Sequence, residues 1–199
     1  GDSGFYGPSM SADGRYVAFA SSASNLAPGA SGFYEIFLRD RQAGTTELVS
    51  VKNPGPTTTD STWPAVSADG RYIAFMSGSN HVVPEDVNFM YDVFVRDRQT
   101  GVTKRVSVDS LGTAPNGDSG FPSISADGLN IAFHSGAFNL VVGDDNDAYD
   151  IFVHNIQTGE TERVSVDSGG AQSNGYSSHP AISADGRVIA FESLASNLT

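Results

Sequence analysis

Cysteine is missing from the 199-residue sequence, so the chain has neither disulfide bonds nor thiolate ligands. Long apolar runs are missing too: no stretch approaches the roughly 20 residues of a membrane-spanning helix, and no basic-then-apolar leader opens the chain. Basic residues are few, with 11 Lys and Arg against 23 Asp and Glu and a formal net charge of −12. This charge argues against nucleic acid and anionic membranes as partners, since both repel an acidic protein.

Glycine and proline are plentiful, at 22 and 9 residues, which favours short strands joined by turns over long helices. The tetrapeptide Ser-Ala-Asp-Gly occurs four times, beginning at Ser11, Ser67, Ser125 and Ser183. Subtracting successive serine positions gives spacings of 56, 58 and 58 residues, a period typical of a repeated structural unit. We therefore expect one array of repeats, at about residues 1–56, 57–114, 115–172 and, as a partial unit, 173–199.

Each repeat is predicted to hold four extended segments, which we letter A to D in chain order. Asp-Gly joins A to B, because this dipeptide tolerates the positive φ angles of a tight hairpin turn. Segment B alternates, with Val17 and Phe19 on one face and Tyr16 and Ala18 on the other, so we expect both faces to be covered. Segment C is predicted at residues 34–40, 91–97 and 149–155, and D at residues 47–51, 104–108 and 162–166.

A four-stranded sheet of this size cannot bury both faces alone, so the sheets must stack on one another. Stacking around an axis gives an all-β fold, a β-propeller built from four-stranded antiparallel blades. The sequence predicts three full repeats plus a two-stranded fourth. The A–B and C–D hairpins would share one face of the disc, the hairpin face, and the long B–C and D–A loops would share the other, the long-loop face.

The number of repeats leaves three arrangements open. The chain is a fragment of a longer protein of about six to eight blades, a four-bladed ring with a two-stranded last blade, or one of two chains that pool their blades. An unpaired edge strand in the last repeat favours association. A homo-oligomer that completes the propeller is therefore one expectation.

Three motifs recur together: Ser-Ala-Asp-Gly-Arg before an Ile-Ala-Phe run, then Asp-Val-Phe-Val-Arg-Asp, then Thr-Gly-x-Thr-x-Arg-Val-Ser-Val. In the second copy they begin at Ser67, Asp92 and Thr100. The pattern resembles the WD40-like propeller repeats of TolB-like proteins and, more loosely, the propellers that cap prolyl-oligopeptidase-type enzymes. The resemblance implies a propeller exported by a bacterium, periplasmic or extracellular. That family includes protein-binding modules, cell-surface repeat proteins and gating domains of peptidases, so function stays open.

The B–C loops carry the densest set of oxygen ligands. Calcium takes six to eight oxygens, and Asp-x-Asn spacing on a turn can deliver several of them from one loop. The alternative is that Asp and Asn initiate turns and hydrogen-bond loop amides. The candidate Ca²⁺ ligands are Asp144, Asp145, Asn146 and Asp150 in the third repeat and Asp86, Asn88 and Asp92 in the second.

A ring side chain precedes the segment-A proline in three copies. Trp63, Phe121 and His179 share this position, with Tyr6 nearby in the first copy. If segment A lines the central channel, these side chains gather at its mouth on the long-loop face and form a platform for a peptide or a sugar ring. The alternative is that each ring wedges between blades as part of the core.

We expect a non-catalytic module that binds a protein or peptide through its long-loop face, because a rigid repeat scaffold presents two variable loops per unit there. One alternative is a carbohydrate-binding, lectin-like propeller, with calcium as a possible aid. Another is the gating propeller of a larger hydrolase. No nucleophile, base and orienting group can be assembled by spacing, so no enzyme activity is predicted.

Overall fold

The computed structural model describes residues 6–51 and 59–198, and in this part of the chain it holds fourteen β-strands and no helix. Consequently none of these residues belongs to a helix that could cross a bilayer. The expected repeat boundary near residue 56 lies outside the described residues, so that boundary stays a prediction.

The strands form three four-stranded antiparallel sheets and one two-stranded sheet, each with its strands in chain order. The first sheet holds β1 (Ser9–Met10), β2 (Tyr16–Ser21), β3 (Glu35–Asp40) and β4 (Thr45–Leu48). The second holds β5 (Ser61–Val66), β6 (Tyr72–Ser77), β7 (Asp92–Asp97) and β8 (Val102–Arg105). The third holds β9 (Ser119–Ile124), β10 (Asn130–Ser135), β11 (Asp150–Asn155) and β12 (Thr161–Arg163). The fourth pairs β13 (Ser177–Ile182) with β14 (Ile189–Ser193).

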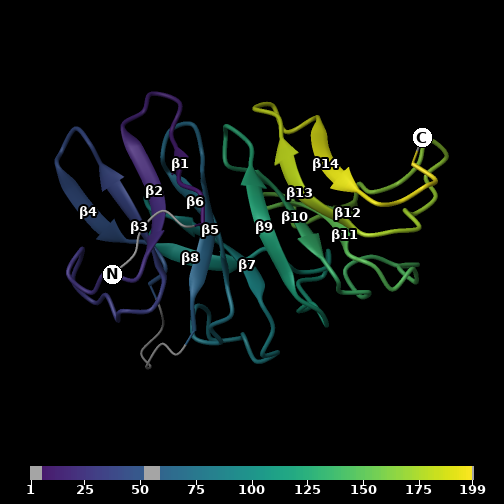
Figure 1. Ribbon diagram of the computed structural model, residues 1–199, viewed down its shortest axis with the longest axis horizontal. Coiled ribbons are helices and arrows are strands. Elements are labelled where there is room, and N and C mark those ends of the chain that lie inside the picture. Colours follow the sequence, from purple (N-terminus) through teal and green to yellow (C-terminus); the bar gives the residue numbers. More distant parts are fainter. Residues whose placement is uncertain (1–5, 52–58, 199) are drawn as a thin grey trace.

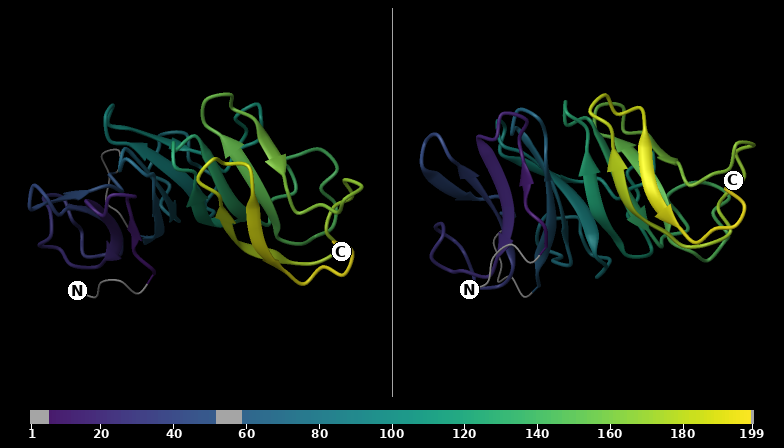
Figure 2. Two further views of the ribbon diagram at one scale, coloured as in Figure 1. Left: turned by 90° about the horizontal axis from the view of Figure 1, so that it is seen from above. Right: turned by 45° about the horizontal axis from the view of Figure 1, so that its top comes forward.

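The sheets follow one another along a curve, from the first at one end to the fourth at the other (Figures 1 and 2). The first strands of successive sheets are neighbours, since β1 contacts β5, β5 contacts β9, and β9 contacts β13. These are the innermost strands, and β4, β8 and β12 are the outermost. The expected architecture of three full blades and a two-stranded fourth is confirmed.

The Ser-Ala-Asp-Gly turns are held by a short network of polar contacts. In the second repeat, Ser67 Oγ donates to Asp69 Oδ1 (2.6 Å) and accepts the Tyr72 N–H (3.0 Å). The same Asp69 oxygen accepts the Arg71 N–H (2.9 Å), and the Gly70 N–H donates to the Ser67 carbonyl (3.0 Å). The other three copies repeat these bonds. Because serine and aspartate satisfy the local amides, the turn has the same shape in all four repeats.

The turns also join neighbouring sheets. The N–H of Ala12 donates to the carbonyl of Ala68, that of Ala68 to Ala126, and that of Ala126 to Ala184, each at 3.0 Å. These bonds lie at the hairpin end of the innermost strands. They fix the distance and register between one sheet and the next.

The apolar core lies between sheets. Small side chains on one sheet, such as Ala74 and Val93, pack against the phenylalanines of the next, Phe133 and Phe152. The first and second sheets meet in the same way. Within each four-stranded sheet, two phenylalanine rings stack across the second and third strands, with centroids 5.8–5.9 Å apart. Cover on both faces of the second strand is confirmed for β6 and β10, whose central Ile, Ala and Phe are all buried. For β2 the expectation is wrong, because Val17 and Phe19 are only half-buried while Ala18 and Ala20 on the other face are buried.

The fourth strand of each blade ends earlier than the sequence predicts. The sequence predicts a strand that continues through a Val-Ser-Val segment, but β4, β8 and β12 end at Leu48, Arg105 and Arg163. The reason is a serine side chain: Ser107 Oγ accepts the N–H of Val93 at 3.1 Å, as Ser50 does for Ile36 and Ser165 for Ile151, both at 3.0 Å. The hydroxyl takes the place of a backbone carbonyl and ends the ladder.

Gly70 allows two neighbouring sheets to approach closely. Its φ is +72°, and a Cβ at this position would overlap the ring of Tyr16 from the preceding sheet. That ring is held in place by Arg15 and Arg98, whose guanidinium carbons lie 4.8 and 4.6 Å from its centroid. Gly14 has a similar φ of +69°, but a Cβ there would meet nothing closer than Met10 Sδ, at 3.5 Å.

Gly70→Ala and Gly14→Ala therefore separate backbone strain from packing between sheets. Both variants pay about 1–2 kcal/mol for a left-handed alanine. Gly70→Ala should lose a further ~1–3 kcal/mol, because it must push the Tyr16 ring aside. Urea unfolding of the two variants measures the difference, and equal losses would contradict the packing described here.

Candidate functional site

Trp63, Phe121 and His179 occupy the left-handed region of backbone space, with φ of 52°, 50° and 51°. Each is followed by proline and lies where the innermost strand shifts register against its neighbour, that is, in a β-bulge. In the first repeat the residue before the proline is Gly7, with φ of 63°. A left-handed residue other than glycine costs about 1–2 kcal/mol, so three ring side chains stand where glycine would be less strained.

The bulges bring these rings into contact. The centroids of Trp63 and Phe121 lie 4.5 Å apart, those of Phe121 and His179 4.4 Å, and those of Tyr6 and Trp63 5.9 Å. All four predicted residues therefore lie together in one line of rings across the four sheets, which we call the aromatic row. Tyr6, Trp63 and Phe121 are half-buried, and His179 is exposed.

More rings adjoin the row on its long-loop side. Tyr6 packs edge-on against Tyr34 at 5.1 Å, and Phe121 packs against His134 at 4.7 Å. His134 in turn lies 5.0 Å from Tyr149. Tyr34 and Tyr149 directly precede β3 and β11, so they lie at the ends of the B–C loops. Sequence reasoning placed them inside the third strand and missed them, although each is the last residue before that strand.

His134 is a buried imidazole behind the row. It is 6% exposed, and its Nδ1 has no hydrogen-bond partner among the described residues. Burial, with a smaller contribution from His179, lowers the pKa of His134 to about 4. The ring is therefore neutral near pH 7.

The acidic B–C loop of the second sheet surrounds an arginine. Arg105 Nη1 lies 3.2 Å from Asp86 Oδ1 and 3.3 Å from Asp92 Oδ2, and all three side chains are buried. Ser107 Oγ donates to Asp92 (2.6 Å), and Asn88 Nδ2 donates to the same carboxylate (3.0 Å). Burial, followed by the charge of Asp92, raises the pKa of Asp86 to about 6.

The third sheet repeats this arrangement. Arg163 Nη1 lies 3.0 Å from Asp144 and 3.8 Å from Asp150, and Asn146 Nδ2 donates to Asp150 at 2.8 Å. The Asp145 carboxylate lies outside this group and accepts a hydrogen bond from the Gln172 amide. Burial and the Asp150 charge raise the pKa of Asp144 to about 6.

The first sheet lacks the arginine. Strand pairing aligns Leu48 with Arg105 and Arg163, since each pairs with the second phenylalanine of its sheet. Counting back from Glu35, the partner of Ser21, puts Gly29 where Asp86 and Asp144 stand. The arginine of the fourth strand and the aspartate of the B–C loop are thus both present in the second and third sheets and both absent from the first. That correlation between repeats is a signal in the sequence that could have identified Arg105 and Arg163.

The predicted calcium ligands are therefore brought together, but around a guanidinium. In the described part of the chain, no group of three or more His, Asp or Glu side chains is arranged to hold a metal ion. A calcium ion would have to displace Arg105 or Arg163 from its carboxylates. Calcium binding at Asp86, Asn88 and Asp92 or at Asp144, Asp145, Asn146 and Asp150 stays a prediction.

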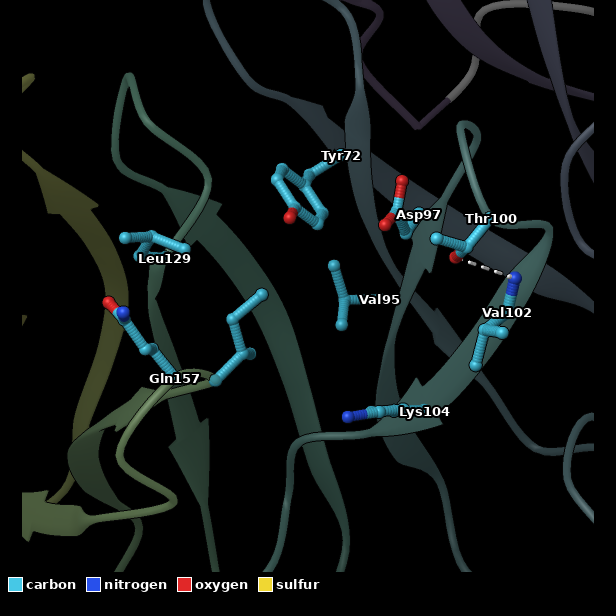
Figure 3. Close-up of a pocket in the computed structure, with 9 residues that line it drawn as sticks. Tyr72, Val95, Asp97, Thr100, Val102, Lys104, Leu129 and Gln157 are labelled. Carbon is cyan, nitrogen blue, oxygen red and sulfur yellow. Dashed lines mark hydrogen bonds between the residues drawn. The ribbon is translucent and has the colours of Figure 1, made fainter.

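A groove of about 500 Å³ lies between the second and third sheets on the hairpin side (Figure 3). Val95 and Lys104 from the second sheet form one wall, and Leu129 and Gln157 from the third form the other. Its acid, Asp97, is already paired with Arg71 at 2.8 Å. Lys104 supplies an ammonium group to the lining of the groove. The sequence did not predict this groove.

Asp86→Asn tests the buried charge cluster through its pH dependence. Because the pKa of Asp86 is raised from 3.8 to about 6, the folded state binds more protons than the unfolded state between these values. The wild type should therefore lose on the order of 2 kcal/mol of stability at this group as pH rises from about 4 to about 6. Asp86→Asn should not lose it. Urea unfolding at several pH values measures this, with the exposed Glu85→Gln as control, and a difference independent of pH would contradict the assignment.

No family model and no curated protein matches the chain. Solved structures do match. TolB from Acinetobacter baumannii is 21% identical with a TM-score of 0.56, over 92% of this chain and 36% of that protein. A TolB from Agrobacterium tumefaciens is 21% identical with a TM-score of 0.59, over 94% of this chain and 53% of that one. Dipeptidyl peptidase 4 from Porphyromonas gingivalis is 15% identical with a TM-score of 0.57, over 95% and 29%.

The chain thus spans between about a third and about half of the length of the TolB structures. At these identities the likeness concerns the fold, since one fold carries many functions. The antiparallel four-stranded sheets and the TolB structures agree on a partial propeller. The resemblance of the repeats to those of TolB-like propellers is confirmed at the level of the fold.

Proposed function

We propose that this chain is a non-catalytic propeller module that binds a protein or peptide at the aromatic row on its long-loop face. The observation that carries the proposal is the left-handed backbone at Trp63, Phe121 and His179. Strain of this kind persists only where surrounding structure enforces it, and it is common at ligand-binding positions. Here it directs ring side chains toward one another, where they remain partly open to solvent.

The loops around the row support the same proposal. The B–C loops expose large apolar side chains, including Phe89 (84% exposed), Phe138 (66%) and Val142 (103%). Phe89 also has a left-handed backbone, with φ of 59°. Exposed aromatic side chains are typical of protein-binding surfaces, where aromatic residues supply much of the affinity.

Two alternatives remain in view. A row of rings also suits stacking on sugars, which favours a carbohydrate-binding module. The likeness to a dipeptidyl peptidase of similar fold is compatible with a propeller that gates a hydrolase. An exported setting, periplasmic or extracellular, belongs to the proposal and follows from the resemblance to TolB-like repeats.

Trp63 makes the proposal directly testable, because it is the single tryptophan of the chain and lies inside the row. A displayed peptide library should yield ligands that shift or quench its fluorescence. Phe121→Ala should weaken those ligands about tenfold or more, as loss of a central interface ring does. Val102→Ala, which removes an exposed apolar side chain from the outermost strand β8, is the control and should have little effect.

A parallel glycan array distinguishes the leading alternative. Glycan ligands with no peptide ligands would replace the proposal by the carbohydrate-binding one. If peptides bind but Phe121→Ala and Val102→Ala have equal effects, the site is not the aromatic row and the proposal fails.

A further inference from the structure

Cationic side chains are concentrated on the hairpin half of the molecule. Arg15, Arg71 and Arg187 belong to the A–B turns, and Arg41 and Arg98 follow the third strands at the C–D turns. Arg39, Arg96 and Lys104 lie on strands beside these turns. On the long-loop half, the Lys and Arg residues that the structure describes are Arg105 and Arg163, and both are buried against two aspartates.

Carboxylates dominate the long-loop half. Several of them are exposed or half-exposed and lie in the B–C and D–A loops or at the ends of strands next to these loops. They are Glu85, Asp109, Asp145, Asp147 and Asp167, together with Asp60 and Asp118 before the innermost strands and Glu192 at the end of β14. A surface with one sign of charge attracts partners of the opposite sign and raises their association rate.

Three of these carboxylates interact with a residue of the aromatic row or with a residue beside it. Asp60 and Asp118 stand three residues before Trp63 and Phe121, and each uses one oxygen to accept a backbone N–H, from Tyr34 at 2.9 Å and from Tyr91 at 2.8 Å. Burial, followed by the charge of Asp118, raises the pKa of Tyr149, a ring beside the row. Glu192 lies 3.5 Å from His179 at the other end.

The buried imidazole behind the row adds an independent observation. His134 packs edge-on against Phe121, and its Nδ1 has no partner in the described part of the chain. A buried nitrogen without a hydrogen bond is destabilising, and a neutral imidazole can offer one nitrogen as an acceptor. Guanidinium and ammonium groups are donors only, so they complement the carboxylates around this ring cluster.

We propose that the aromatic row binds a cationic segment of a partner protein, with arginine or lysine side chains stacked on Trp63 and Phe121 and paired with Asp60 and Asp118. This inference rests on the proposed peptide-binding function and specifies the chemistry of the peptide. Cations are attracted to the faces of aromatic rings, most strongly to tryptophan, and nearby carboxylates reinforce that attraction. Arginine fits best, because its planar group stacks on a ring while its edge donates hydrogen bonds.

The test uses three short peptides with the same leucine background. At the same fixed positions, one carries arginine, the second carries citrulline, the neutral isostere of arginine, and the third carries glutamate. Binding is followed by Trp63 fluorescence. The arginine peptide should bind about tenfold more tightly than the citrulline peptide at ~50 mM salt, and most of that preference should disappear at ~500 mM. The glutamate peptide should bind most weakly.

Asp118→Asn assigns the effect to the row. The amide keeps an oxygen to accept the Tyr91 N–H but removes the charge, so the arginine peptide should weaken about threefold to tenfold and the citrulline peptide should not change. Glu162→Gln, the same loss of charge on the outermost strand β12, is the matched control and should leave both peptides unchanged.

The outcomes separate the two proposals. Equal binding of the arginine and citrulline peptides, with a Trp63 response, overturns the cationic partner and leaves the peptide-binding function standing. Tighter binding of the glutamate peptide overturns it too. If none of these peptides binds while library ligands do, the cationic partner is again wrong, and if no peptide of any kind binds, both proposals fall.

Discussion

The structure depends on a backbone hydrogen bond between turns of neighbouring sheets, from one Ser-Ala-Asp-Gly alanine to the next. The turn can make this bond because its serine and aspartate already satisfy the local amides, which leaves the N–H and carbonyl of Ala68 free for the sheets on either side. No sheet buries both faces alone, so the joint and the apolar layers beside it must form together. Repeat proteins are stabilised in this way by contacts between nearest neighbours.

The same joint aligns the candidate site, whose rings stand at the third of six residues in β5, β9 and β13. With successive strands held in fixed register, each bulge comes beside its counterpart, and Trp63, Phe121 and His179 meet although 58 residues separate each from the next in the sequence. Sheet packing stabilises the strained backbone of these three residues. Charge is also divided between the two halves of the molecule. The exposed Lys and Arg that the structure describes lie at the hairpin turns and on the strands beside them, whereas the long-loop half that holds the ring cluster carries carboxylates.

The repeat predicted the fold well, because its period, its Asp-Gly turns and its alternating strands depend on local rules that all four copies obey. The aromatic row was also predictable, since Trp63, Phe121 and His179 occupy one repeat position. The charge clusters were only half predicted. The aspartates around Asp86 and Asp144 suggested calcium, whereas Arg105 and Arg163 lie outside those loops in sequence and reach the carboxylates only through sheet pairing. The left-handed backbone and the His134 environment are likewise tertiary effects, which no single repeat reveals.

Hydrogen exchange at the turns tests most directly whether neighbouring sheets are joined there. Ala68 and Asp69 are adjacent in one turn. The Ala68 N–H donates to the Ala126 carbonyl of the next sheet, whereas the Asp69 N–H has no acceptor among the described residues. Residue-resolved exchange by NMR should show Ala68 and Ala126 protected to the level of the central strands and Asp69 exchanging rapidly. Equally fast exchange at Ala68 and Asp69 would contradict the joint, and with it the alignment of sheets that assembles the aromatic row.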